Sequence, residues 1–196
     1  MLGGTFCRRN ISDARTARFT AADEKLGAPT SHGEKAMTLK CEIYTQTSQT
    51  TVTVRIRTSV SNLRKALQQA YGAIIQYLAE NEEQPAGPPF AVYDRRGRDS
   101  LDVEAGFPVF KSLPGKEGIQ AGQLPAGKVA SCLFTGPYDH MEPAYQELER
   151  WIIGQGYEPT GIAYEVYMND PAYTPPNTLK TQIILPLKGA TDSSVE

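Results

Sequence analysis

The sequence predicts an α+β domain made of two tandem β-α-β-β units, whose strands join in one antiparallel sheet. Residues 51–57 alternate between apolar and polar types, which is typical of a strand with one buried face. Residues 63–78 repeat apolar positions at the spacing of an amphipathic helix. The same order of elements then returns after residue 127, so we predict a two-repeat architecture.

Composition sets the broad class of the protein. A chain of 196 residues forms one domain or two small ones. Its net charge of −2 argues against a surface for nucleic acid or anionic membrane. No stretch approaches the roughly 18 apolar residues of a membrane span. The three cysteines, Cys7, Cys41 and Cys132, are few and widely spaced, so we expect no disulfide framework or CxxC motif and a reducing cytoplasm.

The two ends differ from the rest of the chain. Residues 1–36 contain four arginines but almost no apolar periodicity, and no apolar run marks a secretory signal. We expect a disordered leader there, with Met37 as a plausible alternative start. The domain is predicted over residues 37–188, and residues 189–196 form a loose tail.

The first half contains four predicted strands and one helix. After Leu39–Tyr44 and Thr51–Arg57, the helix begins behind Ser61-Asn62. The acidic, Pro/Gly-rich segment 80–89 ends it, and the strands Phe90–Tyr93 and Leu101–Val109 follow. We interpret Lys111–Gly127 as a linker without regular structure.

The second half repeats the order strand, helix, strand, strand that residues 51–109 show. Lys128–Phe134 is a predicted strand, and Asp139 with Glu142 resembles the capping box of a helix that Gly154 and Gly156 end. The strands around Glu165 and at Leu179–Leu187 complete the unit.

An overlay of the two halves at an offset of 74 residues supports a duplication. It places Tyr71 on Tyr145, Tyr93 on Tyr167, and Ala91 on Glu165. The repeats span about residues 37–110 and 128–188. A coherent diagonal of this kind is unexpected by chance.

Glu165 is the main candidate for a functional residue. It lies between aromatic residues in the predicted strand 163–168, although acidic residues are depleted in strands and an unpaired buried carboxylate is costly. The alternative is that this strand face is simply solvated. We expect a ligand cleft between the repeats, on the sheet face that no helix covers, where Ala91 and Tyr93 lie opposite Glu165 and Tyr167.

Other residues are weaker candidates. Glu104 lies in the middle of a strand, where a solvated face is the simpler interpretation, and Tyr173 could cover the cleft from its loop. Tyr71, Tyr145 and Trp151 have helical spacing and are interpreted as core. His32 and His140 are too isolated for a metal site or a catalytic triad, and we expect no cofactor.

These motifs resemble the GyrI-like small-molecule-binding domains, which have a two-repeat SHS2/GyrI-like fold. The resemblance covers about residues 37–188 and includes Phe134–Tyr138 at the start of a helix, Tyr164–Tyr167 before Asn-Asp-Pro, and the last strand. Such domains bind effectors in AraC- and MerR-type multidrug regulators, including BmrR. The resemblance implies that Glu165 attracts lipophilic cations in an aromatic pocket and that Tyr167 and Tyr138 occupy characteristic aromatic positions.

The resemblance leaves three functions open. The first is stand-alone binding of hydrophobic or cationic small molecules, since we find no helix-turn-helix segment and expect no direct nucleic-acid binding. The second is hydrolysis of cyclopropane rings in DNA-alkylating compounds, with Glu165 as general base and Tyr167 or Tyr138 as hydrogen-bond donor. The third is binding of a protein partner, as in gyrase inhibitors.

Overall fold

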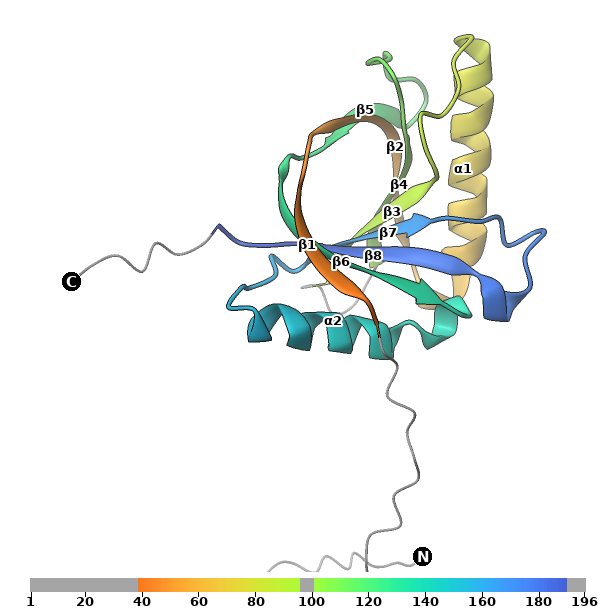
Figure 1. Cartoon of the computed structure of the whole chain (residues 1–196). Coiled ribbons are helices and arrows are strands. Elements are labelled where there is room, and N and C mark those ends of the chain that lie inside the picture. The colour runs from red at the N-terminus through yellow and green to blue at the C-terminus, as the bar shows by residue number, and fades with distance from the viewer. Residues whose placement is uncertain (1–38, 96–100, 190–196) are drawn as a thin grey trace, which may run out of the picture. The chain divides into compact units, whose positions relative to one another are not determined.

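The computed structural model describes residues 39–95 and 101–189, all within the unit Met37–Glu196. The expected leader 1–36 and all but the first residue of the expected tail lie outside these ranges. The described residues form a mixed α/β fold with one antiparallel sheet of eight strands and two α-helices (Figure 1). None of the described helices is long and apolar enough to cross a membrane.

The eight strands follow the predicted segments, with one addition. The bounds are β1 Cys41–Gln46, β2 Gln49–Thr58, β3 Phe90–Asp94, β4 Leu101–Pro108, β5 Ile119–Leu124, β6 Gly127–Thr135, β7 Ile162–Tyr167 and β8 Lys180–Pro186. The addition is β5, so the prediction of an irregular linker over 111–127 was wrong. Its sequence, Ile-Gln-Ala-Gly-Gln-Leu, has too few apolar positions to show the alternation of a strand, and pairing with β2 supplies its order instead.

The two helices bury one apolar stripe each. Helix α1 spans Leu63–Glu80, and helix α2 spans Glu142–Gly154. The predicted capping box at the start of α2 is not formed, because a short 3-10 turn over Tyr138–His140 precedes the helix and its N-cap is Met141. The buried stripes are Ala70, Ile74, Tyr77 and Leu78 in α1, and Ala144, Tyr145, Leu148 and Ile152 in α2.

The strand order in the sheet is β1-β6-β8-β7-β3-β4-β2-β5. Strands β2, β4 and β3 of the first half are arranged in the mirrored order of β6, β8 and β7 of the second half. The halves meet at the central pair β3–β7, whose register sets Ala91 opposite Glu165. These are the two residues that the sequence overlay superposes.

Short connections join the strands of the two sheet edges. Two residues separate β1, at one edge, from β2, which lies next to the other edge. Likewise, two residues separate β5 from β6. The Gln46 side-chain amide donates to the Pro125 carbonyl at 2.7 Å where these connections meet. The sheet therefore curls, and its edges approach each other (Figure 1).

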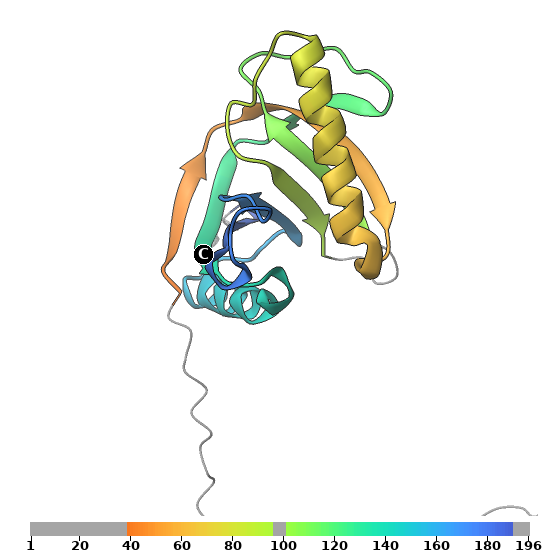
Figure 2. The ribbon, with the colours of Figure 1, turned by 90° about the vertical axis from the view of Figure 1, so that its right-hand side faces the viewer.

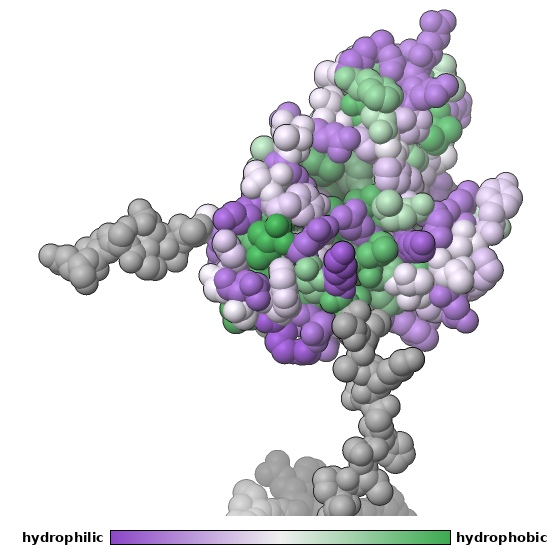
Figure 3. Space-filling view, in the orientation of Figure 1, coloured by the Kyte–Doolittle hydropathy of each residue, from purple (hydrophilic) through white to green (hydrophobic). Residues whose placement is uncertain are grey.

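The two faces of the curled sheet have separate cores. Helix α1 packs over β2 and β4, and α2 packs over β6, so both helices cover one face (Figure 2). The opposite face carries a third cluster around Val129, Tyr164 and Ile184. In the space-filling view, green apolar atoms appear within the bend of the sheet, between more hydrophilic rims (Figure 3). The central strands β3 and β7 lie between the regions that the helices cover.

Candidate functional site

Glu165 lies at the centre of the sheet and is only 6% exposed. Because strand side chains alternate, Ala163, Glu165 and Tyr167 of β7 share the face that carries the helices. Both carboxylate oxygens are occupied. Oε1 accepts a hydrogen bond from the Tyr145 hydroxyl at 2.7 Å, and Oε2 accepts one from the Tyr167 hydroxyl at 2.8 Å. The buried carboxylate is thus satisfied by phenols from α2 and from its own strand.

A third phenol, that of Tyr93, extends this arrangement. The hydroxyls of Tyr93 and Tyr167 lie 2.9 Å apart. A tyrosine hydroxyl has one proton to donate, and that of Tyr167 is directed to Glu165. With Tyr167 as the donor to Glu165, Tyr93 is the donor to Tyr167, which gives a chain of hydrogen bonds from Tyr93 through Tyr167 to Glu165.

Aromatic rings from both halves surround Tyr167. The Tyr138 ring, just before α2, meets it edge-on at 5.5 Å between centroids. The Tyr71 ring of α1 meets it at 6.4 Å, also in a T-shaped arrangement, and the Tyr71 hydroxyl donates to the Phe90 carbonyl at 2.9 Å. The residues Tyr71, Tyr93, Tyr138 and Tyr167 are all partly exposed. We call these four residues with Glu165 and Tyr145 the tyrosine site.

Arg95 places a positive charge next to the tyrosine site. Its guanidinium lies 4.1 Å from the centroid of the Tyr145 ring, on the residue whose hydroxyl binds Glu165. Two carboxylates of α2 also pair with Arg95, Glu142 at 3.5 Å and Glu149 at 3.7 Å. Arg95 therefore connects the surface of α2 to the buried carboxylate.

Burial controls the protonation of the site. It raises the pKa of Glu165, while the hydrogen bonds from Tyr145 and Tyr167 and the charge of Arg95 oppose part of that rise. The pKa values of Tyr71, Tyr93, Tyr145 and Tyr167 are also raised, mainly by burial and additionally by the negative charge of Glu165. The tyrosines thus stay protonated and act as donors, and Glu165 is held closer to neutrality than an exposed glutamate.

The structure brings most of the predicted residues together. Glu165, Tyr167, Tyr93 and Tyr138 are all at the tyrosine site, and Ala91 lies directly across from Glu165 with no exposed surface. Tyr71 and Tyr145 belong to the site as well, although sequence reasoning assigned them to the core. Their coincidence in the overlay, one on each helix at equivalent positions, was the signal that could have identified them.

Two predicted residues lie elsewhere. Glu104 is on the opposite face of β4 and pairs with Arg55 at 3.9 Å, with a third of its side chain exposed. Tyr173 is 88% exposed in the turn after β7, and its backbone amide bonds to the carbonyl of Asp170. Neither residue makes a described contact with Glu165.

The site also lies on a different face from the expected one. The prediction placed it on the face without helices, but Tyr145 of α2 and Tyr71 of α1 contact it directly. The reason is that the two helices cover the outer strands of their own halves and leave the central pair accessible to side chains from both.

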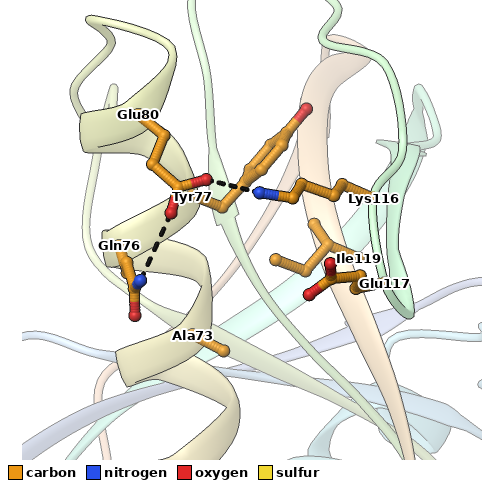
Figure 4. Close-up of a pocket in the computed structure, with 7 residues that line it drawn as sticks. All are labelled: Ala73, Gln76, Tyr77, Glu80, Lys116, Glu117 and Ile119. Carbon is orange, nitrogen blue, oxygen red and sulfur yellow. Dashed lines mark hydrogen bonds and ion pairs between the residues drawn. The ribbon is translucent and has the colours of Figure 1, made fainter.

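A separate shallow pocket of about 130 Å³ lies between α1 and the turn before β5 (Figure 4). It is smaller than the roughly 300–1,000 Å³ of typical small-molecule sites. Lys116 and Glu80 pair across it at 2.7 Å. It contains no residue of the tyrosine site; its lining is Ala73, Gln76, Tyr77, Glu80, Lys116, Glu117 and Ile119.

Metal binding has no support in the side chains that the structure describes. Across residues 39–95 and 101–189, no three His, Cys, Asp or Glu side chains gather closely enough to hold an ion.

Comparison with known proteins identifies the domain. The model of the GyrI-like small molecule binding domain matches residues 38–188. No functionally curated protein matches the sequence. Among solved structures, EcmrR in a complex with DNA superposes with a TM-score of 0.69 at 20% identity, covering 79% of this chain but only 59% of that one. This chain thus spans less than two thirds of EcmrR. The isolated EcmrR C-terminal domain superposes with a TM-score of 0.65 at 19% identity, and the match covers 78% of this chain and 99% of that domain.

Two further structures share the fold. SAV2435 bound to tetraphenylphosphonium superposes with a TM-score of 0.56 at 13% identity, covering 76% of this chain and 94% of that one. A hydrolase from Listeria innocua superposes with a TM-score of 0.55 at 15% identity, covering 76% and 92%. At these identities the likenesses establish a common fold.

Proposed function

Because the chain belongs to the GyrI-like small molecule binding domain family, we propose that it binds hydrophobic, often cationic, small molecules at the tyrosine site. The observation that carries the proposal is the buried Glu165, which is ringed by partly exposed tyrosines from both halves. A structural sheet has no need of a carboxylate at its centre, whereas a site for cations does.

The energetics fit a lipophilic cation. At about 4 Å and an effective dielectric near 20, a carboxylate and a cation attract by roughly 4 kcal/mol before desolvation. Aromatic faces add about 0.5–2 kcal/mol each through cation–π contact. A cation bound beside Glu165 also favours its ionised form, so binding offsets the cost that burial imposes on the charge.

We infer that the two β-α-β-β halves arose by duplication and that the site lies where their symmetry is broken. The overlay sets Ala91 of one half on Glu165 of the other, and these residues face each other at the centre of the sheet. One half supplies a small side chain where the other supplies the charge. A single carboxylate, rather than two repelling ones, is what one monovalent cation requires.

Tetraphenylphosphonium is a suitable probe, because SAV2435 shares the fold and is bound to it. We expect Glu165→Gln to weaken tetraphenylphosphonium binding by about 1–3 kcal/mol, as for the loss of a charge-assisted contact. Binding of neutral triphenylphosphine oxide should change much less. Fluorescence or calorimetric titration at pH 8 measures both.

Glu104→Gln is the matched control, since Glu104 is also in the middle of a strand but lies on the opposite face beside Arg55. It should leave both affinities unchanged. Equal binding of the cation by the parent and by Glu165→Gln would refute the proposal.

A second candidate is hydrolysis of a strained ring, favoured by the raised pKa of Glu165 beside tyrosine donors. Here Glu165 would accept a proton from water as the oxygen attacks a cyclopropane carbon. Tyr167 or Tyr138 would donate to the carbonyl that takes the electrons of the broken bond. A spirocyclopropane alkylator should then yield many equivalents of water-opened product, with kcat reduced about 10²–10⁴-fold in Glu165→Gln. One equivalent of bound, intact compound per protein in mass spectrometry would identify a binder instead.

The wider setting follows from the same proposal. EcmrR is found in a complex with DNA, but this chain superposes on the isolated C-terminal domain of that protein. Direct nucleic-acid binding is therefore not part of the proposed function. The cytoplasmic location inferred from the cysteines, and any protein partner, stay predictions.

A further inference from the structure

Cys41 and Cys132 lie directly opposite each other on neighbouring antiparallel strands. Strand β1 pairs with β6 so that the two residues are register partners, although about 90 residues separate them in sequence. Opposed residues in an antiparallel pair have Cα atoms about 4.5 or 5.5 Å apart, depending on their place in the hydrogen-bond pattern. Both values lie within the roughly 4.4–6.8 Å that a disulfide spans.

The side chains of the two cysteines also share one face of the sheet. Register partners in a sheet project to the same side, and both cysteines pack into the core beneath α2. Cys41 packs against the buried cluster that contains Cys132, and its thiol donates to the Leu39 carbonyl at 3.8 Å. Cys132 is 1% exposed, whereas Cys41 is partly exposed. Any cross-link would therefore form from the Cys41 side.

We propose that Cys41 and Cys132 form a disulfide site, which small-molecule disulfides oxidise and which then fixes the edge strand β1 to β6. The Cys41 thiolate attacks one sulfur of the external disulfide, giving a mixed disulfide and releasing one thiolate. The Cys132 thiol loses its proton, attacks the Cys41 sulfur and releases the second thiolate. Two protein thiols are oxidised, and one external disulfide is reduced to two thiols.

The surroundings make this reaction slow at neutral pH. Burial and the nearby charge of Glu147 raise the pKa of Cys41, and burial raises that of Cys132 to about 12. Because the thiolate is the nucleophile, exchange at neutral pH is slower than for an exposed cysteine. The pair is thus a site of lasting cross-linking rather than a rapid sensor.

The cross-link would act on the fold rather than on the tyrosine site. Strand β1 pairs only with β6 in the described sheet, so it is the strand most easily detached at that edge. A disulfide here closes a loop of about 90 residues, which is in the range where cross-links restrict the unfolded chain strongly.

The experiment uses the full chain with Cys7→Ser, so that only the register pair remains. It is treated with oxidised glutathione at pH 8.5 and, in parallel, refolded from urea in a glutathione redox buffer. We expect a monomer that has lost two hydrogens, about 2 Da, and one peptide pair joining Cys41 to Cys132 in a non-reducing digest. The melting temperature should rise by about 5–15 °C and return on reduction.

The control adds Cys132→Ala to the same background. It should accept one glutathione at Cys41 and show no rise in melting temperature. Glutathione adducts on both cysteines, disulfide-linked dimers, or free thiols after both treatments would overturn the proposal.

Discussion

The hydroxyl of Tyr93 lies 2.9 Å from that of Tyr167, and the two residues are separated by the same 74 positions that superpose the halves of the sequence. Each half thus contributes an equivalent phenol to the centre of the sheet. The equivalence ends two residues before each tyrosine. There, Glu165 accepts a hydrogen bond from Tyr167, whereas the alanine side chain of Ala91 has no polar atom to pair with Tyr93. Protons are therefore donated in one direction, toward Glu165.

Tyr145→Phe should destabilise the protein by about 1–3 kcal/mol. The change removes the only described donor to Oε1 of a carboxylate that is 6% exposed, and an unsatisfied buried charge is costly. Tyr157→Phe is the control, because the Tyr157 hydroxyl bonds to Lys128 near the surface and its loss should cost under about 0.5 kcal/mol. Urea unfolding of both variants measures the difference, and equal midpoints would contradict the assigned bond.

The stability of the parent relative to Glu165→Gln should fall as the pH rises above about 4.5. Glu165 has a higher pKa in the folded protein than in the unfolded chain, so the native state binds more protons between those two values. Its contribution is therefore fully present below the unfolded pKa and is lost as the pH rises through the folded pKa. Thermal melts of both proteins from pH 4 to 8 test this, and a constant difference would show that Glu165 titrates normally.

Arg95→Met should strengthen tetraphenylphosphonium binding at pH 8 by about two- to tenfold. Removal of the guanidinium beside Tyr145 takes away a positive charge that repels the cation, and frees the carboxylates of Glu142 and Glu149. The pKa of Glu165 should rise at the same time, so the affinity should fall at a higher pH than in the parent when the solution is acidified. Arg150→Met, which removes a surface partner of Glu147, should change neither quantity. Unchanged affinity in Arg95→Met would show that the charge of Arg95 does not act on the bound cation.

Gly106→Ala should destabilise the protein by about 2 kcal/mol or more. A Cβ at this position of β4 would lie 2.7 Å from Thr53 Cγ2 and from the Val52 carbonyl, and 2.8 Å from Phe90 Cζ. Gly72→Ala in α1 meets nothing within 4 Å and should stabilise by about 0.5–1 kcal/mol, since alanine is the better helix former. Chemical denaturation of the two variants should give changes in the free energy of unfolding of opposite sign, negative for Gly106→Ala and positive for Gly72→Ala.

The sequence predicted the elements with clear periodicity. Strand β2 and helix α1 were recognised because their apolar residues recur at two and at 3.6 residues. The apolar residues of β2 are buried or partly buried, but Thr53, which was expected to face away from the core, is buried as well. Strand β5 was missed, since its order comes from pairing with β2 and not from its own residues. The register of Cys41 with Cys132 is invisible for the same reason, because spacing along the chain says nothing about partners across a sheet.

The sequence named part of the cluster around Glu165, but it missed Tyr71 and Tyr145 and placed the cluster on the wrong face of the sheet. Alternation put Glu165 and Tyr167 on one face correctly, yet it cannot say which face the helices cover. Tyr145 was taken for core, and it is indeed buried, but its hydroxyl has a second role that helical spacing cannot reveal. Glu104 shares the chemistry of Glu165 but lies on the other face beside Arg55, so residue type alone did not separate them.

The pairing of β1 with β6 has a consequence for how the chain is made. During synthesis β1 emerges early, but its partner follows about 90 residues later, after the whole first helix and four other strands. Contacts over such a separation slow folding, because a long loop must close before they form. In a nascent chain that ends before Gly127, β1 therefore has no strand to pair with. The first half cannot adopt its native pairing until the second half has left the ribosome.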